Sequence, residues 1–266
     1  MPHDAPAGCR AELDRIARER IIILDGAMGS LLQKEGLGED DYRGRRFAGH
    51  PKELRGCNDL LCLTRPELVA AIHDAYLEAG ADIVSSNSLN ANALSLADYG
   101  LEDRAYGISR AAGALARTAA DKYSTAARPR FAAGSVGPGS RSASLSPDLS
   151  DPARRGITWD ELEAAYYDSA RGLLDGGVHL LLLETFFDTL NAKAAIAAVI
   201  RLREERGDIP FILSASVSGP SGRLLSGQTV EAFAVSTAHG EPWALGLNCS
   251  LGAEKLLPHL EALAAA

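Results

Sequence analysis

An α/β fold built around a parallel β-sheet is predicted by three features of this 266-residue sequence. Short apolar runs alternate with longer amphipathic segments from about residue 20 onward. The runs are almost continuously apolar, as expected for strands buried on both faces of a parallel sheet. The segments between them carry helix start and stop signals. Repeated strand–helix units leave two architectures open, a (β/α)8 barrel and an open doubly wound sheet.

Six runs are predicted to be strands: IIILDG at 21–26, ADIVSSNS at 81–88, FAAGSVGP at 131–138, LLLLETF at 180–186, FILSASVS at 211–218 and WALGLNC at 243–249. Two of the intervening helices begin with a capping box, in which Glu follows Thr by three residues. Thr64 and Glu67 begin a helix that stops at Gly80, and Thr158 and Glu161 begin one that stops at Gly176. Residues 1–19 are predicted to be a helical N-terminal extension, followed by a barrel domain over 20–266.

The strand ends favour the barrel. Polar or glycine residues end every run, namely Asp25, Asn87, Gly137, Glu184, Ser216, and Asn248 with Cys249. An open sheet would gather such residues at one switch point, whereas a barrel builds its active site from all of its βα loops. The glycine motif DGAMGS is not a dinucleotide fingerprint. The sequence therefore predicts a (β/α)8 TIM-type barrel with six of its eight strands, incomplete and C-terminally truncated in this chain.

Composition excludes several classes of partner. The formal net charge is −8 and the basic residues are scattered, which argues against binding to nucleic acid or to an anionic membrane. No apolar run reaches the roughly 20 residues of a membrane span, and the charged N-terminus lacks the apolar centre of a signal peptide. The four cysteines show no disulfide-like spacing, so we expect a reducing, cytoplasmic location.

Six motifs at strand ends or in adjoining loops resemble the homocysteine-binding domain of cobalamin-dependent methionine synthase. They are LDGAMGS at 24–30, the segment 58–92 beginning NDLLCLT, the segment 133–162 beginning AGSVGPG, LLLETFFDTLNAKAA at 181–195, SGRLLSGQTVEAF at 221–233 and GLNCSLG at 246–252. The resemblance runs from about residue 20 to the end of the sequence. SPDLSDPARRGIT at 146–158 is similar to the cobalamin-dependent branch of the family.

The resemblance implies a homocysteine S-methyltransferase of methionine biosynthesis. In that family a zinc-bound homocysteine thiolate accepts a methyl group from methylcobalamin. Homocysteine is the implied substrate, and the implied partners are cobalamin-binding and folate-binding domains or chains. Zinc matters because a free thiol, with a pKa of about 8.5, is mostly protonated at neutral pH, whereas coordination to a metal deprotonates it.

The resemblance also assigns roles to residues. Cys249 matches the first of three cysteine ligands of zinc and is the predicted catalytic residue. The other two ligands form a Cys-Cys pair after two glycines, a motif that this sequence does not contain. Asp25 and Glu184 match the residues that hold the amino group of homocysteine. The backbone of Gly26, Ala27, Met28 and Gly29 would hold its carboxylate, and Asn87 and Ser88 would line the pocket. Asn248, beside Cys249, would lie at the metal and contact the substrate, although it could also simply close the turn.

The residues alone allow simpler interpretations. A carboxylate at a strand end is as often a helix N-cap as a ligand contact, and a lone cysteine is usually a small buried residue. Asp188 and Asn191 could cap the helix that follows Glu184. For the whole chain, the alternative to the enzyme is an inactive barrel fragment or a non-catalytic binding partner of a complementary chain. A generic phosphate-binding barrel enzyme would need a phosphate site near its last two strands.

Overall fold

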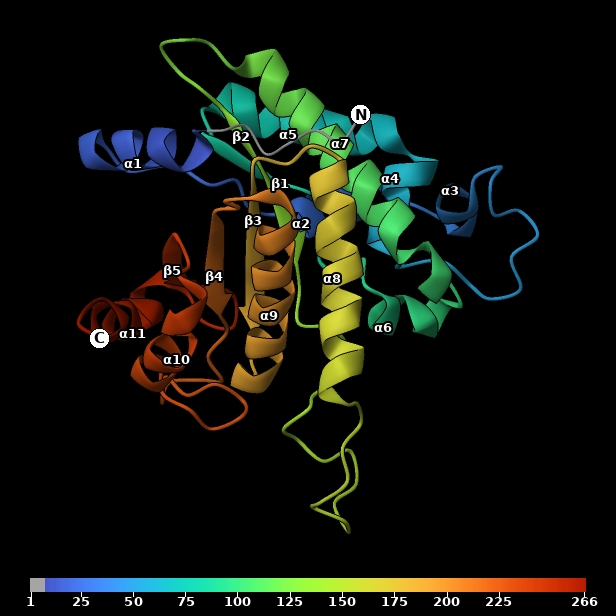
Figure 1. Cartoon of the computed structure of the whole chain (residues 1–266). Helices are drawn as coiled ribbons and strands as arrows, with labels where there is room; N and C mark the ends of the chain where they lie inside the picture. Colours follow the sequence, from blue (N-terminus) through green and yellow to red (C-terminus); the bar gives the residue numbers. More distant parts are fainter. Residues whose placement is uncertain (1–7) are drawn as a thin grey trace.

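The computed structural model describes residues 8–266 and contains one parallel sheet of five strands in the order β1-β2-β3-β4-β5. The strands are β1 (Ile83–Ser85), β2 (Phe131–Val136), β3 (Leu180–Phe186), β4 (Phe211–Ala215) and β5 (Ala244–Leu247). Each strand pairs in parallel with the next along the chain, and helices pack against the sheet (Figure 1). A strand order without reversal has no switch point and is the order of a barrel. The predicted α/β fold, a partial TIM-type barrel, is confirmed.

The first predicted strand, at 21–26, is wrong as a regular strand. It is reduced to one parallel bridge between Leu24 and Ile83 beside β1. The Asp25 amide donates to the Ile83 carbonyl, and the Ile83 amide donates to the Ile23 carbonyl. On its other side this segment faces solvent, since Ile21 is 82% and Ile23 49% exposed. An apolar run paired on one side only forms too short a ladder to count as a strand, and its residues lie at an open edge of the sheet.

Three long helices cover the outer face of the sheet: α7 (Ala105–Tyr123), α8 (Trp159–Asp175) and α9 (Thr189–Arg206). The predicted capping box begins α8, because the Glu161 amide donates to Thr158 Oγ1 at 3.3 Å and the Thr158 amide donates to Glu161 Oε2 at 2.9 Å. Glycine lets α7 and α8 approach closely, since a Cβ on Gly113 would lie 2.7 Å from the Leu173 carbonyl oxygen. Among residues 8–266, no helix has both the length and the apolar character needed to cross a bilayer.

The inner face of the sheet is apolar at one end and polar at the other. Helix α1 (Cys9–Glu19) packs Leu13 and Ile16 against Ile83, Phe131, Ala133, Leu180 and Leu182, near the N-terminal ends of the strands. Residues 1–7 of the predicted N-terminal extension lie outside the described residues, and its boundary at residue 19 stays a prediction. Toward the C-terminal ends, hydroxyl and carboxyl side chains replace the apolar ones, among them Ser85, Ser135 and Glu184. The polar end is therefore the place to look for a site.

A long insertion before β1, at residues 27–65, forms a small helical layer with its own core. It contains α2 (Met28–Lys34), α3 (Glu39–Arg43) and α4 (Leu61–Thr64), followed by α5 (Pro66–Ala79). The predicted capping box of Thr64 and Glu67 is wrong. Helix α5 begins at Pro66, Thr64 is the last residue of α4, and Glu67 instead accepts a 2.6 Å hydrogen bond from Arg65 Nε. Helix α5 ends at Gly80 in the left-handed conformation, as predicted.

The remaining helices are short or lie near the C-terminus. They are α6 (Ala93–Leu96), α10 (Val230–Thr237), α11 (Ala253–Ala264) and four 3-10 turns at Asn58–Leu60, Ala97–Tyr99, Glu102–Arg104 and Ala238–Gly240. Helices α10 and α11 pack together beside β5 in a separate small core around Val217, Val230, Ala234 and Leu263.

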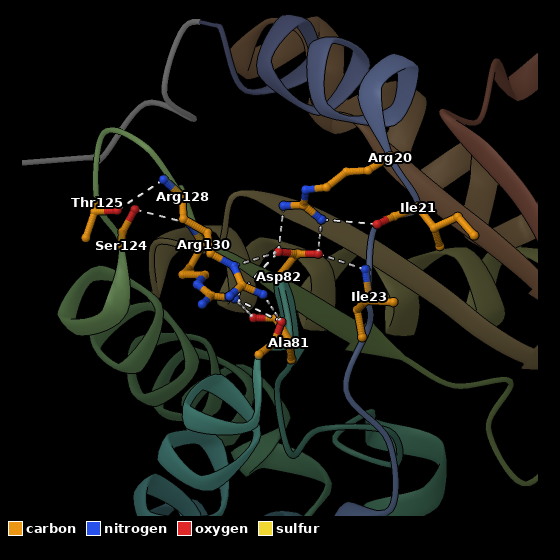
Figure 2. Close-up of polar contacts among 10 residues, drawn as sticks. Arg20, Ile21, Ile23, Ala81, Asp82, Ser124, Thr125, Arg128 and Arg130 are labelled. Carbon is orange, nitrogen blue, oxygen red and sulfur yellow. Dashed lines mark hydrogen bonds and ion pairs between the residues drawn. The ribbon is translucent and has the colours of Figure 1, made fainter.

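Asp82, just before β1, anchors residues 21–26, called the edge segment from here on, to the sheet (Figure 2). Its carboxylate is fully buried and accepts hydrogen bonds from Arg20 at 2.6 and 2.9 Å and from the Ile23 amide at 2.9 Å. Arg128 Nε and Arg130 Nη1 lie 3.7 and 3.5 Å from Asp82 Oδ1. Burial alone would raise the pKa of Asp82, but the hydrogen bonds from Arg20 and Ile23 outweigh it and leave this pKa below its usual value.

Replacing Asp82 by Asn is expected to lower the free energy of unfolding by about 3–5 kcal/mol, because the variant leaves guanidinium groups without their buried counter-charge. Since the folded-state pKa of Asp82 is lowered, its contribution is present above the unfolded-state pKa and lost as pH falls through the folded-state pKa. Urea unfolding at pH 7 and at pH 3 measures both effects. Asp103→Asn, whose side chain is 71% exposed, is the control and should change stability by less than about 0.5 kcal/mol. Equal stabilities of wild type and Asp82→Asn at pH 7 would contradict this account of the anchor.

Candidate active site

A cavity of about 450 Å³ opens at the C-terminal ends of the strands. All ten residues that the sequence nominates for the site line it: Asp25, Gly26, Ala27, Met28, Gly29, Asn87, Ser88, Glu184, Asn248 and Cys249. They come from the edge segment and α2, from the loop after β1, and from the ends of β3 and β5. The structure therefore brings together residues more than 220 positions apart in the sequence. Their individual roles stay predictions.

Asp25 lies in the wall of the cavity and is held by one neighbour. Its carboxylate accepts hydrogen bonds from the Ser85 amide and from Ser85 Oγ, both at 2.9 Å. Burial raises the pKa of Asp25 to about 7, and the negative charge of Glu184 adds to the rise, while the two bonds from Ser85 oppose it. Asp25 thus titrates near neutral pH in the free protein.

Glu184 has a similar environment on β3. It accepts a 2.6 Å hydrogen bond from Ser135 Oγ, and burial raises its pKa above the usual value. Within residues 8–266, no basic side chain forms an ion pair with Asp25 or with Glu184. Two partly buried carboxylates facing one cavity without a counter-charge are costly. A cationic group on a ligand would relieve that cost.

Asn87 and Ser88 use their side chains to brace the cavity wall. Asn87 Nδ2 donates to the Asn58 carbonyl at 2.7 Å, and Ser88 Oγ donates to the Ser135 carbonyl at 2.7 Å. Ser86 Oγ lies 2.6 Å from Ser88 Oγ and accepts from the Ser135 amide at 3.0 Å. The serine bonds fix the loop after β1 against the end of β2, and the Asn87 bond joins it to the turn at Asn58–Leu60. Both residues therefore support the wall as well as line it.

Cys249 stands alone as a thiol at the cavity. It is exposed, in the turn after β5, whereas Cys9, Cys57 and Cys62 are buried elsewhere. Burial raises the pKa of both Cys9 and Cys57 to about 12, so these thiols stay protonated. In the described part of the chain, no three His, Cys, Asp or Glu side chains are placed to hold a metal ion. A catalytic zinc needs three protein ligands, so these residues do not fit the zinc that the resemblance implies.

Sequence reasoning missed several polar residues of the cavity. Ser85 and Ser135 fix the two carboxylates and could have been found, since both are inward-facing positions near strand ends. Asp59 gave no such signal because it lies in the insertion, outside the predicted strands. It is buried, accepts a 2.9 Å hydrogen bond from the Asn90 amide, and has its pKa raised by burial to about 6. It lines the main cavity and also an adjacent one of about 230 Å³.

Asp188 and Asn191 do not line the cavity but bind the loop between β2 and α8. Asp188 is the N-cap of α9, accepting from the Leu190 amide at 2.9 Å, which confirms the capping alternative for this residue. Asn191 is buried, donates to the Arg141 carbonyl at 2.7 Å and accepts from the Ala143 amide at 3.0 Å. These two residues hold the start of the loop between β2 and α8, which projects from the body of the molecule (Figure 1).

Two comparisons with known proteins bear on the family and the fold of this chain. A family model described as homocysteine S-methyltransferase matches residues 22–266. Among solved structures, the chain is similar to the homocysteine methyltransferase MmuM from Escherichia coli. The oxidized form aligns with a TM-score of 0.72 and the metallated form with 0.71, both at 24% identity over 94% of this chain and 82% and 83% of theirs. At this identity the likeness to MmuM shows a shared fold. Because the family model extends over nearly the whole sequence, the chain belongs to the homocysteine S-methyltransferase family.

Proposed function

We propose that the cavity binds homocysteine as the methyl acceptor of a methionine synthase of the cobalamin-dependent type. The observation that carries this proposal is the pair of partly buried carboxylates, Asp25 and Glu184, which have no basic partner among the described residues. A substrate ammonium group between them would supply the missing positive charge and donate to both. The backbone of Gly26–Gly29, beside Asp25, would receive the substrate carboxylate. The side chain of homocysteine would then extend toward Cys249.

The methyl donor is proposed to be methylcobalamin held by a separate cobalamin-binding domain or chain, with a folate-binding domain or chain as a further partner. The support is the likeness of SPDLSDPARRGIT at 146–158 to the cobalamin-dependent branch. Zinc activation of the thiol needs ligands in addition to Cys249, since the described residues offer one thiolate. The four free cysteines are in keeping with the cytoplasmic location that we propose.

Homocysteine binding is expected to release a proton near neutral pH. An ammonium group beside Asp25 stabilises the carboxylate form, so binding lowers a pKa that is about 7 in the free protein. The sign follows from linkage: the ligand prefers ionised Asp25, and its apparent affinity rises as pH rises through 7. For one linked proton the affinity should fall about tenfold between pH 8 and pH 6. Calorimetric titrations in buffers with different heats of ionisation measure the released proton directly.

The same titrations separate the proposed function from its alternative. An inactive fragment would show no saturable heat with homocysteine at any pH. A protein that binds homocysteine as proposed would show saturation with proton release at pH 7. Binding whose affinity does not change between pH 6 and pH 8 would mean that Asp25 does not meet the ammonium group, and would contradict the proposed orientation.

A further inference from the structure

Three residues next to Glu184 and Asn248 adopt the left-handed backbone conformation, which favours glycine and is uncommon for residues with a side chain. Thr185 has φ of 64°, and the consecutive residues Cys249 and Ser250 have φ of 61° and 62°. Thr185 is β-branched, for which this conformation is especially unfavourable. Such strain persists only where the surrounding contacts hold it, and it concentrates at functional sites. The hydroxyl of Ser250 lies 2.9 Å from Ser216 Oγ, whereas Thr185 and Cys249 both bind one side chain, that of Asn248.

Thr185 belongs to a bulge in β3. Leu183 pairs with Leu213 and Phe186 with Ala215, so β3 contains one residue more than β4 between these pairs. The extra residue falls in the Glu184–Thr185 step, directly after the buried apolar part of the strand. A bulge redirects the side chains beside it. Here it leaves Glu184 lining the cavity, within 2.6 Å of Ser135 Oγ.

The side-chain amide of Asn248 joins the ends of three strands. Its Oδ1 accepts from the Thr185 amide at 3.0 Å and from Ser214 Oγ at 2.6 Å. Its Nδ2 donates to Thr185 Oγ1 at 2.7 Å and to Cys249 Sγ at 3.3 Å. An amide has two acceptor sites and two donor hydrogens. All four are therefore used by protein atoms, and none is left for a substrate.

We propose that Asn248 is a positioning residue that clamps Thr185 in its left-handed conformation and so fixes Glu184 of β3 and Cys249 after β5 relative to each other. It does not contact homocysteine, in contrast to the role that the sequence assigned to it. Its bonds to Thr185 set the bulge that presents Glu184. Its bond to Cys249 Sγ orients the thiol. The inference rests on the proposed function only for the ligand used in one of its assays.

A double-mutant cycle tests the clamp. Asn248→Ala removes all four bonds, so we expect homocysteine affinity to fall about tenfold, the loss expected for one misplaced charged contact. Thr185→Gly permits φ of 64° without a clamp and should change affinity by less than about twofold. The double variant should recover to within about threefold of wild type, because glycine no longer needs holding. Additive losses in the double variant would overturn the proposal.

Alkylation of Cys249 gives a second readout that needs no homocysteine. Cys249 is the exposed thiol and the other three cysteines are buried, so iodoacetamide should label one thiol per folded chain. Asn248→Ala should change the labelling rate about three- to tenfold, the equivalent of losing the one hydrogen bond that orients Sγ. Thr185→Gly alone should leave the labelling rate unchanged, and the double variant should keep the changed rate although its ligand affinity recovers. Equal labelling rates in wild type and Asn248→Ala would contradict the thiol half of the proposal.

Two features keep the experiment decisive. If Asn248→Ala does not fold, more than one thiol will label, and Asn248→Asp replaces it. That variant keeps an acceptor for Thr185 and Ser214 but has no donor for Cys249, so labelling of one thiol at the changed rate is still expected. If wild type does not bind homocysteine, the proposed function fails, while labelling rates and the melting temperatures of the same cycle still decide the role of Asn248. A melting temperature that Thr185→Gly fails to restore in the Asn248→Ala background would overturn the clamp.

Discussion

Changing Glu184 to Gln or Asp25 to Asn is expected to weaken homocysteine binding by about 10- to 150-fold in each case, the equivalent of about 1.5–3 kcal/mol for a hydrogen bond to a charged group. Each change keeps the size of the side chain and removes the charge that would face the ammonium group. The double variant should bind more weakly than either single one. Isothermal titration at pH 8, where the linked proton no longer limits affinity, is the measurement.

Folding should survive these two changes, which makes the result interpretable. Burial raises the pKa of both carboxylates, which means that their ionisation at neutral pH destabilises the folded state. We expect wild-type circular dichroism and a melting temperature no lower than that of wild type. The matched control is Glu204→Gln. Glu204 is exposed near the C-terminal end of α9 and does not line the cavity, so this variant should bind homocysteine as wild type does. Unchanged affinity in Glu184→Gln and Asp25→Asn would remove both residues from the binding site.

Zinc binding is expected to be negligible in the 266-residue chain, and methyl transfer from methylcobalamin to be absent. Cys249 is the one thiol at the cavity, and each missing ligand removes much of the affinity of a zinc site. After incubation with zinc and dialysis, elemental analysis should find far less than one zinc per chain. Cys249→Ala should leave that low value unchanged.

Supplying the missing ligands is the positive control. The resemblance implies a Cys-Cys pair after two glycines, so a version of the chain extended by such a segment should hold one zinc and form methionine. Cys249→Ala in the extended version should abolish both. One tightly bound zinc per 266-residue chain, together with turnover, would show that other residues complete the site and would contradict the ligand count.

The gathering of these residues around one cavity could be predicted from the sequence because two regularities of α/β folds coincide. Parallel strands are recognisable as apolar runs, and their C-terminal ends share one edge of the sheet. Asp25, Glu184 and Cys249 therefore had to face the same region once the strands were assigned, and the structure places all three around one cavity. The α8 capping box was equally readable, because Thr158 and Glu161 act only on their own backbone neighbours.

What the sequence could not predict depends on contacts between distant residues. The run at 21–26 has the composition of a strand, but it lies beside β1 alone and forms only a single β-bridge with it. Thr64 and Glu67 have capping-box spacing, but Arg65 binds Glu67 and α4 includes Thr64. Asn248 carries a polar amide at a strand end, which suggested a substrate contact, and its four bonds to three strands are visible only in three dimensions.

The central claim is that this cavity recognises the ammonium group of homocysteine through Asp25 and Glu184. The most direct measurement is the same calorimetric titration repeated with N-acetylhomocysteine, which keeps the thiol and the carboxylate but has no positive charge. We predict that homocysteine binds with proton release at pH 7, and that N-acetylhomocysteine binds at least about 100-fold more weakly and releases no proton, because two charged contacts are lost. Comparable affinities for the two compounds would contradict the account.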